Sequence, residues 1–299
     1  MGRLLRSKLK ASRVVKRSST SISGVLKLFI QTKSGPIGLG IISIYIIMAL
    51  WGQHIRPLDT TPNPLKIYLP PSLQHPLGTD NLGRDTLSFI VNGARDVLYI
   101  SFLAAIISTF LAAFVGSLAG LVGGKVDSAL MYITDTILTI PQFPLMAMLS
   151  GMVRLSDVSL AAIMGVLSWP ALARAIRSQV LSIREREFIE AARILDLGTR
   201  HIVLVEIMPN IMPYIVVNFA LAMIYSLYNY VGLVFLGFVP FKVQNWGVML
   251  NQAWVLGAVY NEASIWWILA PIITITIFEI GLIMLARSLE TVLNPRLRG

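Results

Sequence analysis

The chain has 299 residues, of which 55% are hydrophobic and only 13% are charged, and its formal net charge is +10. A soluble domain carries about 25% charged residues, so this composition excludes an ordinary cytosolic enzyme, a DNA-binding domain and a disordered chain. The absence of cysteine excludes disulfides, iron–sulfur clusters and thiol catalysis. Residues 34–53, 97–124 and 207–241 form uncharged runs long enough to cross a bilayer. The sequence therefore predicts an all-α integral membrane protein.

We predict six transmembrane helices, at about 35–53, 97–123, 128–152, 158–176, 211–238 and 264–287. Nine of the 25 basic residues lie within the first 33 residues, ahead of any acidic residue. With both termini inside, nineteen Lys and Arg residues face the inner side and six face the outer side. Because cytoplasmic loops are enriched in basic residues, this bias predicts cytoplasmic termini in a multi-pass protein of the cell membrane. The basic tail fits contact with anionic lipids in the bilayer, and nothing in it favours nucleic acid.

This topology divides the chain into four parts. Residues 1–34 form a basic cytoplasmic tail, and residues 35–96 hold the first span and an external loop. Residues 97–290 form a five-helix core that includes a cytoplasmic loop at 177–209, and residues 291–299 form a cytoplasmic C-terminal tail. The two hydrophilic segments are too long to be simple turns, so function is expected there.

The external loop contains a dense cluster of turn-forming and charged residues. Glycine suits tight turns, and an arginine beside an aspartate can pin such a loop. The cluster is either a structural lid over the helices or a surface that frames the channel mouth and receives a binding protein. No second histidine lies near the first residue of the cluster, which makes a metal site improbable. Its residues are His75, Gly78, Thr79, Asp80, Gly83, Arg84 and Asp85.

Two carboxylates fall within predicted spans, Asp135 in the third and Glu279 in the sixth. An intramembrane carboxylate is costly and marks a functional site unless it is neutral or paired. The third and fourth spans also contain prolines, which free backbone carbonyl groups and permit kinks. Further polar candidates for a transport pathway are Asn218, Asn229 and Gln252.

The inner segment predicts a short amphipathic helix. Ser182 followed by Glu185 has the spacing of a capping box, so we expect the helix to begin there. The residues Phe188, Ala191, Ala192 and Leu195 are spaced to line one face of it. Gly198 is the expected stop. Spacing alone leaves two possibilities open, a docking helix for another protein or a helix that lies on the lipid surface.

The same segment resembles a known motif. Glu190-Ala191-Ala192, followed after a spacer by Ile207-Met208-Pro209, is similar to the EAA loop of ABC importer membrane subunits. In that family a short helix docks in a groove of the cytoplasmic ATPase. The sequence departs from the family pattern at Asp196, where glycine is expected, and at Glu206, where isoleucine is expected. These departures predict a shifted turn after Leu195.

Further motifs resemble the C-type permeases of the oligopeptide/dipeptide/nickel branch of that family. They are the external cluster from His75 to Asp85, the run from Gly232 to Gly237, Trp246-Gly247, and the terminal stretch from Asn294 to Arg298. The resemblance implies a second homologous permease as a heterodimer partner, two ABC ATPase subunits and an extracytoplasmic substrate-binding protein. It also implies that the following residues couple this chain to the ATPase: Glu187, Glu190, Ala191, Ala192, Arg193, Leu195, Asp196, Gly198 and Pro209.

No P-loop pattern occurs in the sequence, and no catalytic constellation is recognisable. The expected role is therefore a non-catalytic permease subunit that binds no cofactor, with ATP and Mg²⁺ held by its partners. The substrate that the resemblance favours is an oligopeptide or dipeptide, with an oligosaccharide or nickel as the alternative. A function of another class, a secondary transporter that uses Asp135 and Glu279, would require internal repeats that the sequence does not show.

Overall fold

The computed structural model describes residues 29–30, 32–152, 156–198 and 201–293, and in this part of the chain the regular structure is helical. Four helices are long and apolar enough to cross a membrane, namely α3 (Ser34–Ile55), α4 (Thr86–Val122), the stretch Ile202–Phe235 and α13 (Ile265–Leu293). The bent pair of α7 (Asp157–Ser168) and α8 (Pro170–Arg184) supplies a fifth if it is counted as one span. The multi-pass helical architecture expected from the uncharged runs is confirmed.

The first, second, fifth and sixth predicted spans are single helices. The second begins eleven residues earlier than expected, at Thr86, because the Asp85 side chain caps it by accepting a hydrogen bond from the Ser88 amide at 2.9 Å. The fifth span consists of a π-helical turn, η2 (Ile202–Ile207), which runs into α11 (Met208–Phe235). The sixth continues to Leu293, so residues 291–293 extend a helix.

The third and fourth predicted spans are broken. The third divides into α5 (Gly124–Leu138) and α6 (Gln142–Met152), with residues 139–141 between them. The fourth bends by 48° between α7 and α8, at the step from Trp169 to Pro170. Proline explains both breaks, because it lacks an amide hydrogen and its ring clashes with the preceding turn. Pro141 falls in the first break and Pro170 begins the helix after the second.

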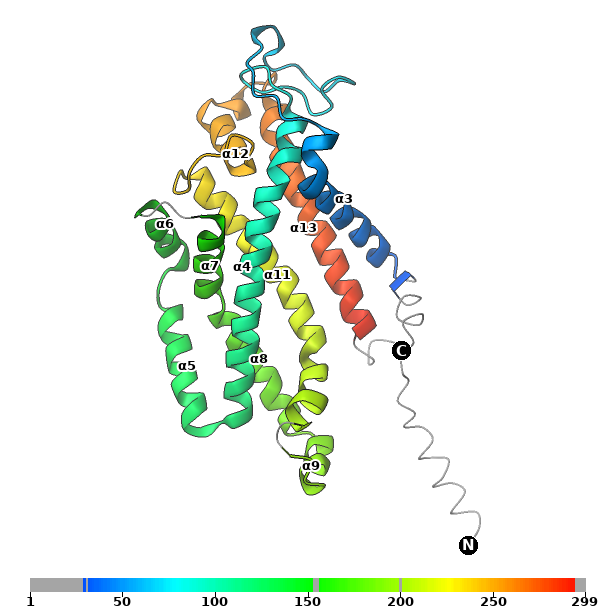
Figure 1. The fold of residues 1–299 in the computed structure, drawn as a ribbon, viewed down its shortest axis with the longest axis vertical. Helices are drawn as coiled ribbons and strands as arrows, with labels where there is room; N and C mark the ends of the chain where they lie inside the picture. The colour runs from blue at the N-terminus through cyan, green and yellow to red at the C-terminus, as the bar shows by residue number, and fades with distance from the viewer. Residues whose placement is uncertain (1–28, 31, 153–155, 199–200, 294–299) are drawn as a thin grey trace.

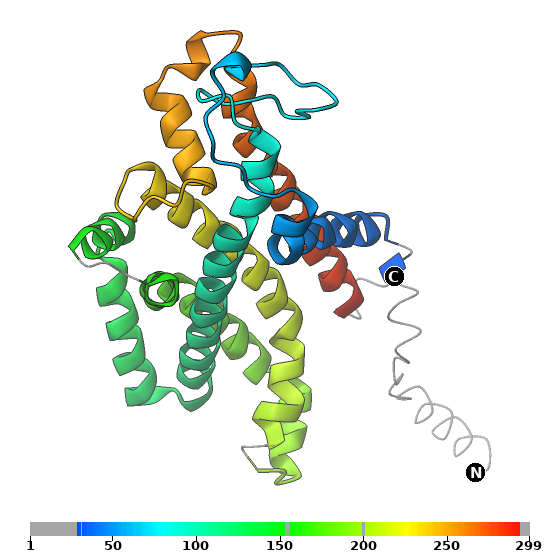
Figure 2. The same cartoon turned by 45° about the horizontal axis from the view of Figure 1, so that its top comes forward.

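The molecule is elongated, with the external-loop residues at one end and the short helix α9 (Glu187–Ile194) at the other (Figure 1). The helix α4 runs through the centre and contacts α3, α7, α8 and α11. The first span, α3, packs along α13, which lies beside it in blue and red in Figure 2. The helix α12 (Trp246–Val255) lies near the external-loop end (Figure 1).

An aromatic cluster joins α3, α4, α12 and α13. The Tyr45 ring lies 5.1 Å from that of Phe278 and 6.3 Å from that of Trp246, measured between centroids. The Trp246 Nε1 donates to the Ile90 carbonyl at 2.9 Å. A Cβ on Gly247 would lie 2.8 Å from the Val231 carbonyl oxygen, so the Trp-Gly pair lets α12 approach α11 closely.

The elongated shape makes the predicted orientation testable, because the chain has no cysteine of its own. Leu73 is fully exposed in the external loop and Lys125 is exposed at the start of α5, near the opposite end. A membrane-impermeant thiol reagent should label Leu73→Cys in intact cells, whereas Lys125→Cys should be labelled only after permeabilisation. Labelling of Lys125→Cys alone in intact cells would contradict the predicted orientation.

Candidate coupling helix and translocation cavity

The external cluster is held together by two aspartates. The Asp80 side chain accepts from the Leu82 amide at 2.9 Å and from the Arg84 Nε at 2.6 Å, and both charged side chains are buried. The Arg84 guanidinium also lies 4.6 Å from the centroid of the Phe89 ring. The expectation that Arg84 and an aspartate pin this loop is confirmed. The second aspartate, Asp85, caps α4 and also pairs with Arg56 and His75.

Asp85 joins three separate segments at the start of α4. Its carboxylate lies 3.0 Å from the Arg56 Nε, after α3, and 2.9 Å from the His75 Nδ1. Thr79 closes the loop, since its hydroxyl accepts from the Leu69 amide at 2.8 Å and donates to the Lys66 carbonyl. The turns at Gly78 and Gly83 have φ of 72° and 75°, which favour glycine. This network fixes the shape of the outer loop and fits the structural-lid reading.

A second charged cluster joins α4, the start of α7 and the loop before α12. The Lys242 Nζ lies 2.8 Å from the Asp157 carboxylate and 3.2 Å from that of Asp96. Partial burial acts to lower the pKa of Lys242, but the hydrogen bond to Asp157 and the charge of Asp96 outweigh it, so this pKa is raised. No local sequence pattern indicates that Lys242 meets Asp96 and Asp157, which lie 146 and 85 residues before it.

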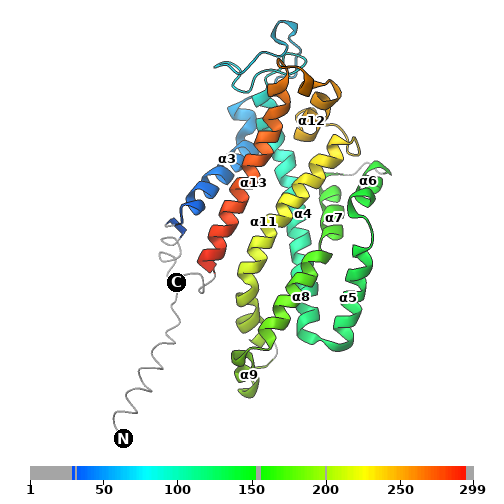
Figure 3. The ribbon, with the colours of Figure 1, turned by 180° about the vertical axis from the view of Figure 1, so that it is seen from behind.

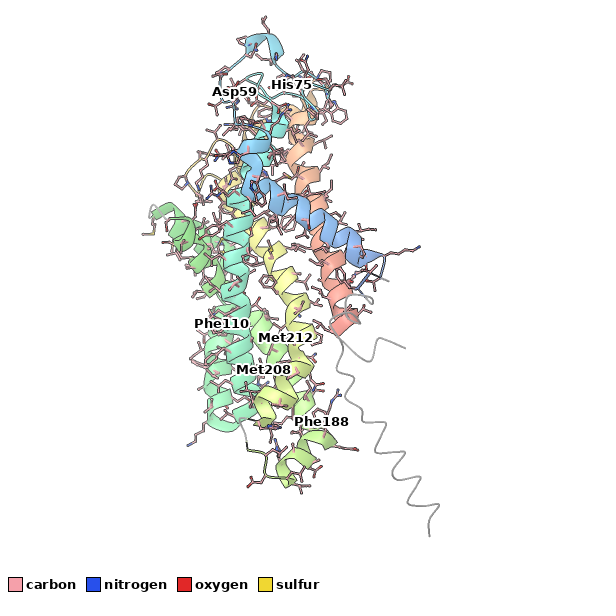
Figure 4. All side chains as sticks on the ribbon, turned by 45° about the vertical axis from the view of Figure 1, so that its right-hand side comes forward. Asp59, His75, Phe110, Phe188, Met208 and Met212 are labelled. Atoms are coloured by element: carbon pink, nitrogen blue, oxygen red, sulfur yellow. The ribbon has the colours of Figure 1, made fainter. Side chains whose placement is uncertain are left out.

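The helix α9 follows α8 after only two residues, Glu185 and Arg186. The predicted capping box is wrong, since Ser182 lies inside α8 and Arg186 precedes α9 without a side-chain cap. Figure 4 shows Phe188 at the end of the molecule opposite to Asp59 and His75. A separate helix therefore forms at the tip, farthest from the external loop.

The two faces of α9 differ from the predicted pattern. Ile189 and Ala192 are buried, in one cluster with Ile183, Ile202 and Ile207. The predicted face of Phe188, Ala191, Ala192 and Leu195 is thus split, because Ala192 is only 5% exposed and points into the protein. Side chains on the outward face are apolar and accessible, with Ile194 79% and Leu195 69% exposed. Glu187, Glu190, Ala191 and Arg193 are also exposed.

The turn after α9 forms at the position where the family pattern has glycine. The Leu197 amide donates to the Ala192 carbonyl at 3.2 Å, and the Asp196 amide donates to the Arg193 carbonyl at 3.0 Å. These two bonds make a Schellman motif, whose central residue adopts a left-handed conformation. Asp196 has φ of 50° and meets this requirement without glycine. The predicted shift of the turn is therefore wrong, and Gly198 adds a second positive φ of 73°.

After the turn, the chain re-enters the helical body through the wide π-helical turn η2. Pro209 is the second residue of α11 and follows η2 directly, so its missing amide hydrogen removes one bond from this continuous helical stretch. Pro213 follows inside the helix. Ile207 and Ile211 are buried in the cluster that also holds Ile189 and Ala192, so the Ile-Met-Pro stretch anchors α9 to α11.

A cavity of about 780 Å³ lies between the broken span and α11. One side is formed by the end of α5 and the start of α6, at Leu138, Ile140 and residues 142–144. Another side comes from the junction of α7 and α8, and the facing wall belongs to α11. Within the described residues, no charged side chain lines the cavity, and its polar groups are Ser108, Gln142, Ser168, Asn218 and Tyr225.

Comparison with known proteins places this architecture in a family. Residues 112–299 match the family described as the binding-protein-dependent transport system inner membrane component. The dipeptide transport system permease protein DppC of Bacillus subtilis is 30% identical over 90% of this chain and 83% of its own length. The chain belongs to this family of transporter membrane components. It is therefore a membrane permease subunit of an ABC importer, a class that works with ATPase and binding-protein partners.

Two other relatives are matched over most of the permease. The oligopeptide transport system permease protein OppC of Bacillus subtilis is 28% identical over 96% of this chain and 94% of its own length. A putative peptide permease protein of Brucella suis is 29% identical over 83% of this chain and 85% of its own length. The similarity therefore extends beyond the family match and includes α3 and the external loop.

Of the pathway residues predicted in the permease, only Asn218 lines the cavity. Asp135 is paired with Arg174 of α8 at 2.6 Å, and Glu279 accepts a hydrogen bond from the Tyr228 hydroxyl at 2.5 Å. Asn229 is buried and donates to the Tyr225 carbonyl, and Gln252 lies in α12. The cavity residues Ser108, Gln142, Ser168 and Tyr225 were missed, and the signal that could have found two of them is their position beside Pro141 and Pro170.

The Schellman turn predicts how Asp196 tolerates substitution. Asp196→Gly should raise the thermal unfolding midpoint of the purified permease, because glycine adopts the left-handed conformation of this turn without the steric cost of about 1–2 kcal/mol that a side chain brings. Asp196→Val should lower the midpoint, because a β-branched residue is disfavoured at positive φ. Asp196→Asn is the matched control and should change it little. An unchanged midpoint for Asp196→Val would show that the turn is not left-handed at this residue.

Proposed function

We propose that this permease forms one half of a peptide translocation pathway and couples it through α9 to a cytoplasmic ATPase. The partners in this proposal are a second homologous permease, two ATPase subunits and an extracytoplasmic binding protein. ATP and Mg²⁺ belong to the ATPase subunits, so this chain alone hydrolyses no ATP and binds no cofactor. Both termini and α9 lie on the cytoplasmic side, as the bias of basic residues indicates.

The observation that carries the proposal is the outward face of α9. A helix that lies on a bilayer keeps its apolar side toward lipid. The helix α9 instead follows α8 at the tip of the molecule, where a partner protein can contact it (Figure 1). Its accessible side chains combine apolar Phe188, Ala191 and Leu195 with charged residues of both signs. Such a mixture of apolar contact and flanking charge suits a protein groove. The buried face, led by Ile189, ties the helix firmly to the body.

The chemistry of the cavity favours a peptide over nickel. A nickel site is built from imidazole, carboxylate or thiolate ligands, and the residues that line this cavity include no histidine, aspartate or glutamate. Neutral hydrogen-bonding groups such as Gln142, Asn218 and Tyr225 can meet peptide amides without selecting side-chain charge. The curated relatives are oligopeptide and dipeptide permeases by name, which supports the same substrate class over an oligosaccharide.

The alternative of a secondary transporter loses its proposed ion-coupling groups. Asp135 is held by Arg174, and Glu279 by Tyr228. Neither carboxylate lines the cavity, so neither is placed to exchange an ion with a substrate there.

The test is uptake of a labelled tripeptide by the assembled complex in proteoliposomes. Ala191→Trp adds a ring to the exposed face of α9. Overpacking a tight contact costs about 1–3 kcal/mol, which should weaken ATPase association roughly 5- to 150-fold. Uptake and recovery of the ATPase should fall together, whereas the isolated permease still inserts in the membrane. Ala192 is unsuitable for this test because it is buried.

Ala129→Trp is the matched control, since Ala129 is an exposed alanine on α5. It should leave ATPase recovery unchanged. The coupling role is refuted if Ala191→Trp assembles and transports like the parent. The peptide assignment is refuted if the parent complex takes up an oligosaccharide or Ni²⁺ in preference to the tripeptide.

A further inference from the structure

Three arginines of α8 reach across to neighbouring helices. The Arg177 guanidinium donates through Nε and Nη2 to the two carboxylate oxygens of Asp127 on α5, each at 2.5 Å. One turn nearer the cavity, Arg174 pairs with Asp135, also on α5, at 2.6 Å. Near the end of α8, Arg184 donates to the Gly120 carbonyl of α4 at 3.2 Å. The bidentate pair is the most directional of these contacts.

The Arg177–Asp127 pair is partly shielded from water, with side-chain exposures of 32% and 16%. The Arg174–Asp135 pair is more than half exposed, at 52% and 56%. Arg177 is therefore the stronger connection between α5 and α8. Figure 3 shows these two helices side by side.

Glycines of α4 bring α8 into close contact on its other side. A Cβ on Gly116 would lie 2.4 Å from the Ala173 carbonyl oxygen, and one on Gly120 would lie 2.9 Å from the Val180 Cβ. Small residues four apart permit such backbone approach in membranes. Beyond this contact, Val180 and Ile183 belong to the same buried cluster as Ile189 of α9. The helix α9 is thus a packed extension of α8.

The helices α5 and α8 also form one wall of the cavity. Leu138, at the end of α5, and Leu172 and Ala175, on α8, line it together. The facing wall includes Leu221 and Tyr225 of α11. The proline breaks at residues 139–141 and between α7 and α8 lie where this wall joins the outer part of the molecule. They are suitable joints because they interrupt the helical hydrogen bonding.

We propose that Arg177 and Asp127 are positioning residues that clamp α5 to α8, so that movement of α9 carries the α5 wall of the cavity with it. Without the clamp, α8 alone would follow the ATPase, and the cavity wall formed by α5 would lag behind. This inference rests on the proposed coupling role of α9. It adds the residues through which motion at the tip reaches the pathway.

Spin-label distances in the assembled transporter test the clamp. The pair Ser128→Cys and Gln179→Cys places labels at exposed positions of α5 and α8. The pair Ser128→Cys and Leu221→Cys measures α5 against α11 across the cavity. On trapping with ATP and vanadate, the α5–α11 distance should change and the α5–α8 distance should not. An α5–α8 change as large as the α5–α11 change would overturn the proposal.

Arg177→Met removes the charge but keeps a long side chain. It should let the α5–α8 distance change on trapping and should lower tripeptide uptake per ATP hydrolysed by roughly 2- to 30-fold. The charge-exchanged double variant Asp127→Arg with Arg177→Asp should restore both readouts, which a defect in folding alone would not allow. Arg287→Met, at an exposed site on α13, is the control and should change neither.

If Arg177→Met leaves the distances and the uptake ratio unchanged, the pair is not a clamp. The distance readout requires no substrate. A failure of the complex to import peptide would therefore contradict the proposed substrate, while the spin-label distances would still test the clamp.

Discussion

The close packing of α8 against the C-terminal half of α4 is the contact on which the functional geometry depends. Within a bilayer, helices gain little from leaving lipid, so association relies on close van der Waals contact and on polar pairs. Gly116 and Gly120 supply the first, and Arg184, which donates to the Gly120 carbonyl, supplies the second. Because α9 follows α8 directly, this contact also fixes where the apolar tip of the permease is presented. A side chain at Gly116 would displace α8 and the tip together.

Breaks in two helices are the second feature on which the cavity depends. Unbroken spans would pack along their full length and leave no space between α5, α8 and α11. Pro141 and Pro170 interrupt two of them at the level where the cavity opens. The outer end is fixed in a different way, through Asp80, Asp85 and the Lys242 cluster. The permease thus combines a rigid loop at one end with an opposite part that is jointed at prolines, an arrangement suited to rigid-body switching of access.

The sequence predicted much of this fold because uninterrupted apolar runs produce α3, α11 and α13 almost unchanged. It failed where tertiary packing overrides local signals. Ser182 and Glu185 have capping-box spacing, yet burial of Ile183 beside Val180 keeps α8 helical to Arg184. The prolines were expected to kink these spans, but how far each helix is interrupted depends on what packs around it.

The segment that we propose couples to the ATPase was recognised through its resemblance to a family, and its orientation required the structure. Ala191 and Ala192 are neighbours in sequence, but helical geometry points one outward and the other into the cluster around Ile189. The cavity could not be predicted because Ser108, Gln142 and Tyr225 come from distant parts of the chain. No local pattern indicates that such residues meet. Asp196 is the reverse case, since an apparent departure from the family pattern proved compatible with the same turn.

The central claim is that the outward face of α9 contacts an ATPase. Site-specific photo-crosslinking in the assembled transporter tests it directly, with a benzophenone amino acid incorporated at the position of Leu195, which is 69% exposed. The predicted result is an adduct with the ATPase subunit that is absent when the probe occupies the position of Leu73 in the external loop. Adducts with lipid alone from position 195, in a complex that still transports, would contradict the claim and identify α9 as a membrane-surface helix.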